Sequence, residues 1–225
     1  MFSVIFEAQP RPGQWGAYLD SASLLRPELE QVDGFVQNVR YRSLTREGWI
    51  LSLSDWRDEK ALVRWRTAMH HHEVQDKGRR EILQNYHLRV GQITDDTNIP
   101  PGSVLEEQRL DETAVGEGTT LVLINDARPA EWGGTSNPPD CAEFLGLDPY
   151  APEMVSWDVF DAVLTPGDLI LMLVFRDRAA ADHFAGTVLL KENARLRQVR
   201  VIRDYGMFDR REAPQYYPEQ RRHAG

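Results

Sequence analysis

The sequence predicts an α+β fold in which two βαββαβ repeats pack sheet against sheet and close into one barrel. Three observations support this prediction. The 225 residues suit two units of about 100 residues each. The chain matches itself at an offset of 119 residues. Both halves also show the same order of strand-like and helix-like patterns.

The internal match holds in segments that lie far apart in each half. The paired segments are Val4 to Pro10 with Leu123 to Pro129, and Gly48 to Trp56 with Gly167 to Phe175. Two unrelated strand–helix units built from common residue types would also match in part. Because one offset serves both pairs of segments, we interpret the halves as copies of one unit.

The first half reads as strand, helix, strand, strand, helix, strand. Turn signals at Asp33-Gly34 and at Thr45 to Gly48 separate its elements. Pro27 lies inside the first helical pattern, so we expect it to end or kink that helix early. The expected strands cover 3–9, 35–44, 49–55 and 86–94, and the expected helices cover 14–30 and 57–84.

The second half repeats this order with two differences. A Gly/Pro-rich stretch from Trp132 to Pro139 delays its first helix. Its last strand matches the first half at an offset of 111, so eight residues are missing around the equivalent of His70 to Lys77. A segment that only one copy has indicates a function in that copy. The later elements are expected as helices over 140–147 and 178–193 and strands over 154–163, 168–175 and 197–203.

These boundaries divide the chain into four parts. Residues 1–98 form the first repeat, 99–118 a linker, 119–203 the diverged second repeat and 204–225 a C-terminal tail. Each βαββαβ unit is a ferredoxin-like repeat with helices on one face of its sheet. Two such sheets cover each other, which gives a pseudo-dimeric α/β barrel within one chain. A pocket is then expected between the sheet and the helices of each repeat.

Charge and composition exclude several classes of protein. The net charge of −9 argues against nucleic-acid binding, and it belongs almost wholly to residues 99–202. A single cysteine excludes a disulfide framework. No apolar run is long enough for a membrane span, and MFSVIFEAQP does not resemble a signal peptide, so we expect a cytoplasmic protein. No nucleotide-binding glycine motif is present.

Several motifs of the chain occur together in one known family. They are Gly13 to Leu25, Asp33-Gly34-Phe35, Leu51 to Glu59, Trp65-Arg66 with the following His71 and Gln75, Gly78-Arg79, Tyr86 to Val90, and the tail segment Arg203 to Arg210. In these segments the chain resembles the antibiotic-biosynthesis monooxygenase family of dimeric α/β barrel proteins. The resemblance covers residues 1–95 and about 200–214, and it implies the same barrel fold.

The resemblance also implies two kinds of chemistry. Some members oxidise polycyclic phenols or quinones with O2 and no cofactor, and others degrade haem. Haem-degrading members have a His ten positions after the helix Trp and an Asn on the first strand, where this chain has Gln75 and Phe6. We therefore expect no cofactor, while haem bound through His71 in another geometry stays open as an alternative.

Three consecutive histidines, His70 to His72, are the first candidates for catalysis. Successive helical residues point about 100° apart, so the three cannot face one site, and no metal site is expected from them. His71 matches the recurring helix His of the family. A neutral imidazole can accept a proton from a substrate or ligate haem iron. A solvated polar helix face is the alternative interpretation.

The remaining candidates are aromatic and polar residues of the first repeat. Aromatic walls suit a flat apolar ligand, although core packing would also explain them. Ser52 and Ser54 share one face of their strand with Trp56, which is also the pattern of an ordinary polar strand face. Tyr86, or else His87 beside it, is predicted as a second proton carrier. The predicted substrate-binding residues are Trp56, Trp65, Ser52, Ser54 and Gln75.

Together these features predict an oxygenase-like enzyme that oxidises a small aromatic, phenolic or quinone-type molecule with O2. His71 is the expected proton acceptor. A haem protein and a non-catalytic ligand-binding or stress-response protein are the alternatives. The basic tail pairs Arg210-Arg211 and Arg221-Arg222 are expected to form a solvated extension that packs on a partner, such as a second copy in a homodimer, or to bind an anion.

Overall fold

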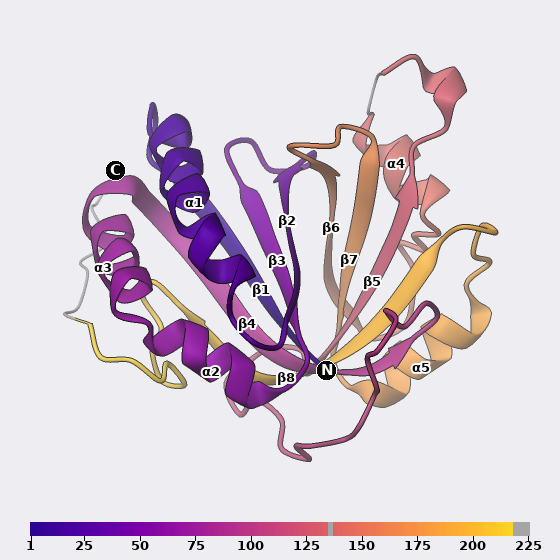
Figure 1. Ribbon diagram of the computed structural model, residues 1–225. Helices are drawn as coiled ribbons and strands as arrows, with labels where there is room; N and C mark the ends of the chain where they lie inside the picture. Colours follow the sequence, from indigo (N-terminus) through magenta and orange to yellow (C-terminus); the bar gives the residue numbers. More distant parts are fainter. Residues whose placement is uncertain (135–136, 218–225) are drawn as a thin grey trace.

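The computed structural model describes residues 1–134 and 137–217, which form a closed barrel of antiparallel strands (Figure 1). Around the barrel the strands follow the order β1-β3-β2-β6-β7-β5-β8-β4. The first repeat contains β1 (Phe2–Pro10), α1 (Trp15–Glu30), β2 (Phe35–Ser43), β3 (Ile50–Trp56), α2 (Glu59–Thr67), α3 (Met69–Lys77), a π-helical turn (Gly78–Ile82) and β4 (Leu83–Asp96). The second contains β5 (Thr120–Ala127), a 3-10 turn (Ala130–Trp132), α4 (Pro138–Phe144), β6 (Met154–Ala162), β7 (Asp168–Phe175), α5 (Arg178–Thr187) and β8 (Arg195–Gly206).

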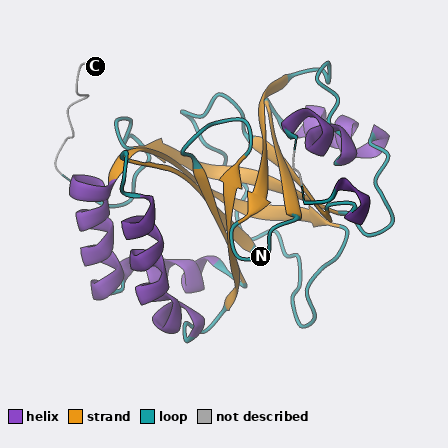
Figure 2. Cartoon of the chain, turned by 90° about the horizontal axis from the view of Figure 1, so that it is seen from above, coloured by secondary structure: helices purple, strands orange, loops and turns teal. Residues whose placement is uncertain are grey.

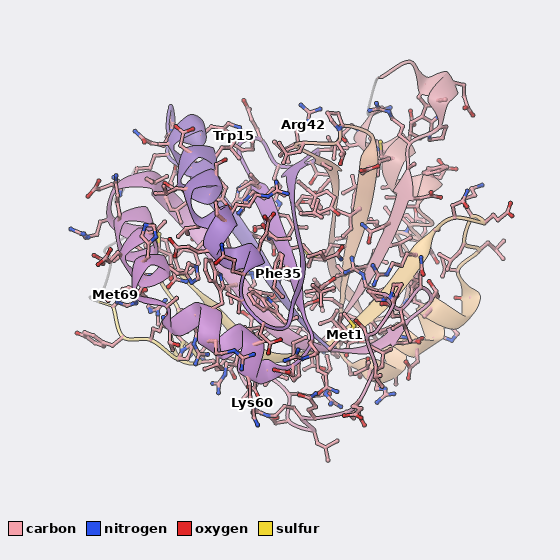
Figure 3. All side chains as sticks on the ribbon, in the orientation of Figure 1. Met1, Trp15, Phe35, Arg42, Lys60 and Met69 are labelled. Carbon is pink, nitrogen blue, oxygen red and sulfur yellow. The ribbon has the colours of Figure 1, made fainter. Side chains whose placement is uncertain are left out.

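The helices lie outside the barrel in two groups. Figure 2 shows one group against each side of the strands, and Figure 1 shows that α1 to α3 cover the β1–β4 side. Side chains alternate along each strand. On β3, Leu51 and Leu53 therefore point into the barrel, while Ser52 and Ser54 point toward the helices. Met1, at the end of the barrel in Figure 3, is fully buried in the same interior cluster as Leu51 and Leu53.

The two repeats are joined by strand pairing at both edges. β2 pairs with β6, and the longer contact is between β4 and β8. At a register shift in this second pair, a Cβ on Gly91 would lie 2.4 Å from Val199 Cγ1 and 2.6 Å from the Arg200 carbonyl oxygen. Only glycine fits this approach of the two strands. The sheet is thus continuous across the repeats.

A buried ion pair also connects the repeats inside the barrel. Asp55 on β3 and Arg197 on β8 are 0% and 1% exposed, and Arg197 Nη1 donates to Asp55 Oδ2 at 2.7 Å. Asp55 also accepts hydrogen bonds from Ser3 Oγ and, at 2.6 Å, from Gln37 Nε2. Arg197 Nη2 donates to Asn125 Oδ1 at 2.8 Å. Both charges are therefore compensated by partners from different parts of the chain.

The offset of 119 residues reappears in the helix caps. Asp58 accepts a hydrogen bond from the Ala61 N–H at the start of α2, and Asp177 accepts one from the Ala180 N–H at the start of α5. Both carboxylates satisfy a backbone donor that lacks a partner in the first helical turn. α2 and α5 are therefore equivalent helices, and α3 is the additional helix of the first repeat.

Three details of the predicted elements are wrong. The helix expected over 57–84 is interrupted at Ala68, whose extended backbone (φ −61°, ψ 130°) separates α2 from α3, and β4 already begins at Leu83. Met69, labelled in Figure 3, starts α3 and is exposed. Pro27 does not end α1, because both Pro27 and Ser23 lie on the solvent side, where water can bind the unpaired Ser23 carbonyl. α5 ends at Thr187, earlier than expected, because Val188 is extended.

Other strand ends differ by a few residues. β8 continues to Gly206 and so crosses the boundary expected at 203, because its last residues pair with β4. None of the helices in the described ranges is long and apolar enough to span a membrane.

Candidate active site

A cavity of about 220 Å³ lies between the sheet and the helices of the first repeat, where the sequence predicts a pocket. The sheet side comes from β1 to β4, the helix side from α1, α2, α3 and the π-helical turn, and one end from β8 and the tail. The lining is mainly apolar and aromatic. The predicted residues His71, Tyr86, Trp56, Trp65, Ser52, Ser54 and Gln75 all line it.

The second repeat fills the equivalent space with its own side chains. Phe184 occupies the position equivalent to Trp65, and it is 4% exposed and 5.3 Å from the Phe175 ring. Phe184 belongs to a buried cluster that also contains Cys141 and Leu145 of the α4 region. In the first repeat, α3 extends the helical layer and contributes His71 and Gln75 to a cavity wall.

His71 is held in one orientation by Trp65. Its ring stacks on the Trp65 indole at 4.3 Å, and Nδ1 lies 3.0 Å from the Trp65 carbonyl oxygen. The interruption at Ala68 makes the contact with His71 possible. Trp65 lies in the last turn of α2, so its carbonyl oxygen is at the end of that helix and not inside a continuous one. A carbonyl only accepts hydrogen bonds, so Nδ1 carries the proton and Nε2 is the unprotonated nitrogen.

The surroundings of His71 favour the neutral ring. The pKa of His71 is lowered to about 4, mainly by burial and to a smaller extent by the nearby His72 and His70, while the Trp65 carbonyl and Glu28 act in the opposite direction. His70 instead contacts Glu28 Oε1 on the exposed side of α1, at 2.5 Å from Nδ1. His72 is exposed and stacks on Tyr217 of the tail. Of the three histidines, only His71 lines the cavity.

Tyr86 accepts hydrogen bonds from two arginines. Arg79 Nη1 and Arg210 Nη1 both donate to the Tyr86 phenolic oxygen, the second at 2.6 Å. With two donors on that oxygen, the phenol can contribute its own O–H as a donor but has little capacity left as an acceptor. Tyr86 can therefore donate its proton but has little capacity to accept one, whereas a proton carrier must do both. Phe6 lies beside it, with ring centroids 5.6 Å apart.

The two serines are fixed by hydrogen bonds within the wall. Ser52 Oγ accepts from Asn38 Nδ2, and Ser54 Oγ accepts from the Trp56 indole N–H, each at 3.0 Å. The Ser54 hydroxyl keeps its proton available for the cavity, while the Ser52 hydroxyl also hydrogen-bonds Tyr18. Tyr18 of α1 also lies at this wall, and burial raises its pKa despite nearby Arg40 and Ser52. These groups can donate to a ligand oxygen.

The tail closes one end of the cavity. Tyr217 Oη donates to Gln75 Oε1 at 3.1 Å, and Gln215 Nε2 donates to the Arg66 carbonyl at 3.0 Å. Figure 1 shows this yellow segment beside α2 and α3. The tail thus packs on its own first repeat, so the expectation of a solvated extension is wrong for Arg210. Arg221 and Arg222 lie outside the described residues.

Arg79, Tyr18 and Tyr217 were not among the predicted site residues, and Arg210 was predicted only as part of a tail that binds an anion or packs on a partner. Arg79 carried no clear signal in the sequence, because Asp76 is a helical neighbour of both Arg79 and Arg80, and the structure shows that it pairs with Arg80, at 2.7 Å. Tyr217 carried no local signal, because its hydrogen-bond partners His72 and Gln75 lie more than 140 residues away in the chain.

Comparison with known proteins assigns the chain to a family. The family model of the antibiotic biosynthesis monooxygenases matches residues 1–77. A protein of Pyricularia oryzae named jasmonate monooxygenase ABM is 45% identical over 223 residues, which cover 97% of this chain and 99% of that protein. The chain belongs to the antibiotic biosynthesis monooxygenase family. It is therefore a monooxygenase-type enzyme, which implies O2 and a small-molecule substrate.

Solved structures of low identity accompany this match. An anthrone oxidase-like protein is 10% identical, with a TM-score of 0.37, 95% of this chain covered and 96% of that chain. A Pseudomonas aeruginosa protein is 20% identical, with a TM-score of 0.36. The match covers 40% of this chain and 89% of that protein.

The cavity of this monooxygenase differs from a haem-degrading site in its size and its lining. Sites for drug-sized ligands have volumes of roughly 300–1,000 Å³, and a cavity of about 220 Å³ is smaller than these. Phe6 and Gln75 line the cavity at the two positions where the haem-degrading members have Asn and His. Across residues 1–134 and 137–217, no group of three or more His, Cys, Asp or Glu side chains could hold a metal ion.

Proposed function

We propose that this monooxygenase oxidises a small, largely apolar molecule with O2 in the first-repeat cavity, and that His71 accepts the proton that leaves the substrate. The observation that carries the proposal is the state of His71. Its Nδ1–H is bound to the Trp65 carbonyl, and its pKa of about 4 leaves Nε2 unprotonated at neutral pH. Nε2 therefore has a free lone pair for a substrate proton, and the anion formed from the substrate would stabilise the protonated ring.

The proposed reaction balances without an external reductant when the substrate carries an activated methylene group. Nε2 removes one proton, and the resulting carbanion or phenolate-type anion reacts with O2 to give a peroxide anion. His71 returns the proton to form the hydroperoxide. Loss of the second C–H proton then breaks the O–O bond and releases water, so the methylene group and O2 give a carbonyl group and water. The substrate supplies all four electrons.

The cavity supports substrates with an acidic proton next to a carbonyl or an aromatic ring. Trp56, Trp65 and Phe6 provide walls for a flat ring, which favours the phenolic or quinone-type molecules expected from the sequence. The name of the Pyricularia oryzae relative adds jasmonate, a cyclopentanone whose carbonyl also acidifies neighbouring C–H groups. Ser52, Ser54 and Tyr18 lie in the wall and can donate to a developing enolate or phenolate oxygen.

The proposal is tested by O2 consumption with purified full-length protein, using anthrone, a naphthohydroquinone and jasmonate as substrates. For the active substrate we expect one O2 consumed per oxidised product, with no NADH requirement and no loss after chelator treatment. The absorption spectrum of the same preparation should lack a Soret band. Turnover proportional to haem content, or turnover that requires NADH, would contradict the proposal.

A further inference from the structure

Among the residues that the structure describes, four arginines line the cavity and no Asp or Glu side chain does. They are Arg40, Arg66, Arg79 and Arg210. In a protein with a net charge of −9, an apolar cavity with several positive groups and no negative one is an unexpected distribution. None of the four forms an ion pair with an acidic side chain of the described residues. Other inward arginines do, such as Arg197 with Asp55 and Arg195 with Asp96.

Three of these arginines have a buried N–H group without a partner. The unpartnered donors are Arg40 Nε, Arg66 Nε and Arg79 Nη2, among the side chains that the structure describes. A buried donor without an acceptor destabilises the protein, and the cost is higher for a charged group. Such donors at a cavity wall indicate a bound acceptor, and their charge indicates an anion.

Arg79 and Arg210 form the clearest anion site, which we call the arginine end. Both donate to the Tyr86 phenolic oxygen, so two positive groups are held close together. Arg79 is only 4% exposed and lies over the Tyr86 and Tyr217 rings, with its carbon Cζ 5.4 and 5.0 Å from their centroids. The rings fix the guanidinium plane, which preorganises Nη2 as a donor.

We propose that the arginine end binds a carboxylate group of the substrate, so that the substrates of this enzyme are apolar monocarboxylic acids. The inference rests on the proposed function, because it assumes that the cavity holds the substrate. A carboxylate suits the site better than a phosphate, because few donors remain free: Arg210 already uses Nη1 for Tyr86 and Nη2 for the Gln215 carbonyl. The rest of the cavity is apolar and would hold the body of the acid.

The test is binding without turnover. Jasmonic acid, octanoic acid and 4-phenylbutanoic acid are each titrated beside their methyl esters into oxygen-free full-length protein, by calorimetry or tryptophan fluorescence. The variants are Arg79→Gln and Arg210→Gln. Each has a matched control at the next residue, since Arg80 and Arg211 are exposed, pair with Asp76 and Asp209, and do not line the cavity. Arg80→Gln and Arg211→Gln change the net charge equally.

We expect at least one acid to bind about 10- to 100-fold more tightly than its ester, as charge-assisted hydrogen bonds allow. Arg79→Gln and Arg210→Gln should remove this preference and leave ester binding unchanged, which also shows that the variants are folded. Arg79→Lys should retain part of the preference. The proposal is overturned if no acid binds more tightly than its ester, or if the control variants lose the preference equally. If an acid binds in this way but none of the substrates of the O2-consumption assay is oxidised, the proposed function fails while this inference stands.

Discussion

Replacing His71 with Asn is expected to lower kcat for the active substrate by about 10²- to 10⁴-fold, with a much smaller change in KM. The Asn amide nitrogen can take the place of Nδ1 and still donate to the Trp65 carbonyl, which lies 3.0 Å from Nδ1 in the native chain. The variant therefore keeps the local structure but lacks the Nε2 base. The measurement is O2 uptake at saturating substrate.

The matched control for this variant is His70→Asn. His70 lies on the same helix next to His71, but it pairs with Glu28 outside the cavity. Its replacement should leave kcat unchanged within about a factor of two, the scatter expected of a surface change. If His71→Asn retained native kcat, another group would be the proton acceptor. If both variants lost activity equally, the loss would reflect damage to α3.

Replacing Arg197 with Leu is expected to lower the free energy of unfolding by about 3–5 kcal/mol. The variant leaves the fully buried Asp55 carboxylate with Ser3 and Gln37 as donors but without a compensating positive charge. It also removes the donor to Asn125. Urea unfolding followed by circular dichroism measures the difference, and the loss affects both repeats because the pair connects β3 to β8.

Two comparisons separate burial from charge in this prediction. Arg57→Leu removes exposed ion pairs with Asp33 and Asp58, and it should change the free energy of unfolding far less than Arg197→Leu does. The double variant Asp55→Leu with Arg197→Leu should recover part of the lost stability, because it leaves no buried charge unpaired. A cost below about 1 kcal/mol for Arg197→Leu alone would show that water or a rearrangement compensates Asp55.

The strands and caps could be predicted from sequence because their signals are local. Alternating side chains on β3 distinguish the barrel-facing Leu51 and Leu53 from the cavity-facing Ser52 and Ser54. Asp58 and Asp177 mark equivalent helix starts at the same offset. The interruption at Ala68 could not be predicted, because alanine has the highest helix propensity. There the tertiary contacts of Trp65 and His71 favour the extended conformation.

The candidate site was predictable only for residues of the first repeat. The family resemblance and the segment missing from the second copy both indicated His71 and the helix that carries it. The arginine end depends on contacts of Tyr86 with Arg79 and Arg210. Tyr86 and Arg210 lie 124 residues apart in the sequence. No periodicity or spacing connects such residues. The same holds for Tyr217 at the end of the cavity.

The pH dependence of kcat/KM tests most directly whether His71 is the base. Burial, with His70 and His72 nearby, holds the pKa of His71 at about 4, below its ordinary value, so the ring is protonated only in acid. Since kcat/KM reports groups of the free enzyme, it should stay constant from neutral pH down to about pH 5 and fall with a midpoint near pH 4. Circular dichroism at each pH identifies any loss caused by unfolding. The role of His71 would be contradicted if kcat/KM fell with a midpoint near the ordinary histidine value of about 6.5 and the remaining activity of His71→Asn showed the same midpoint.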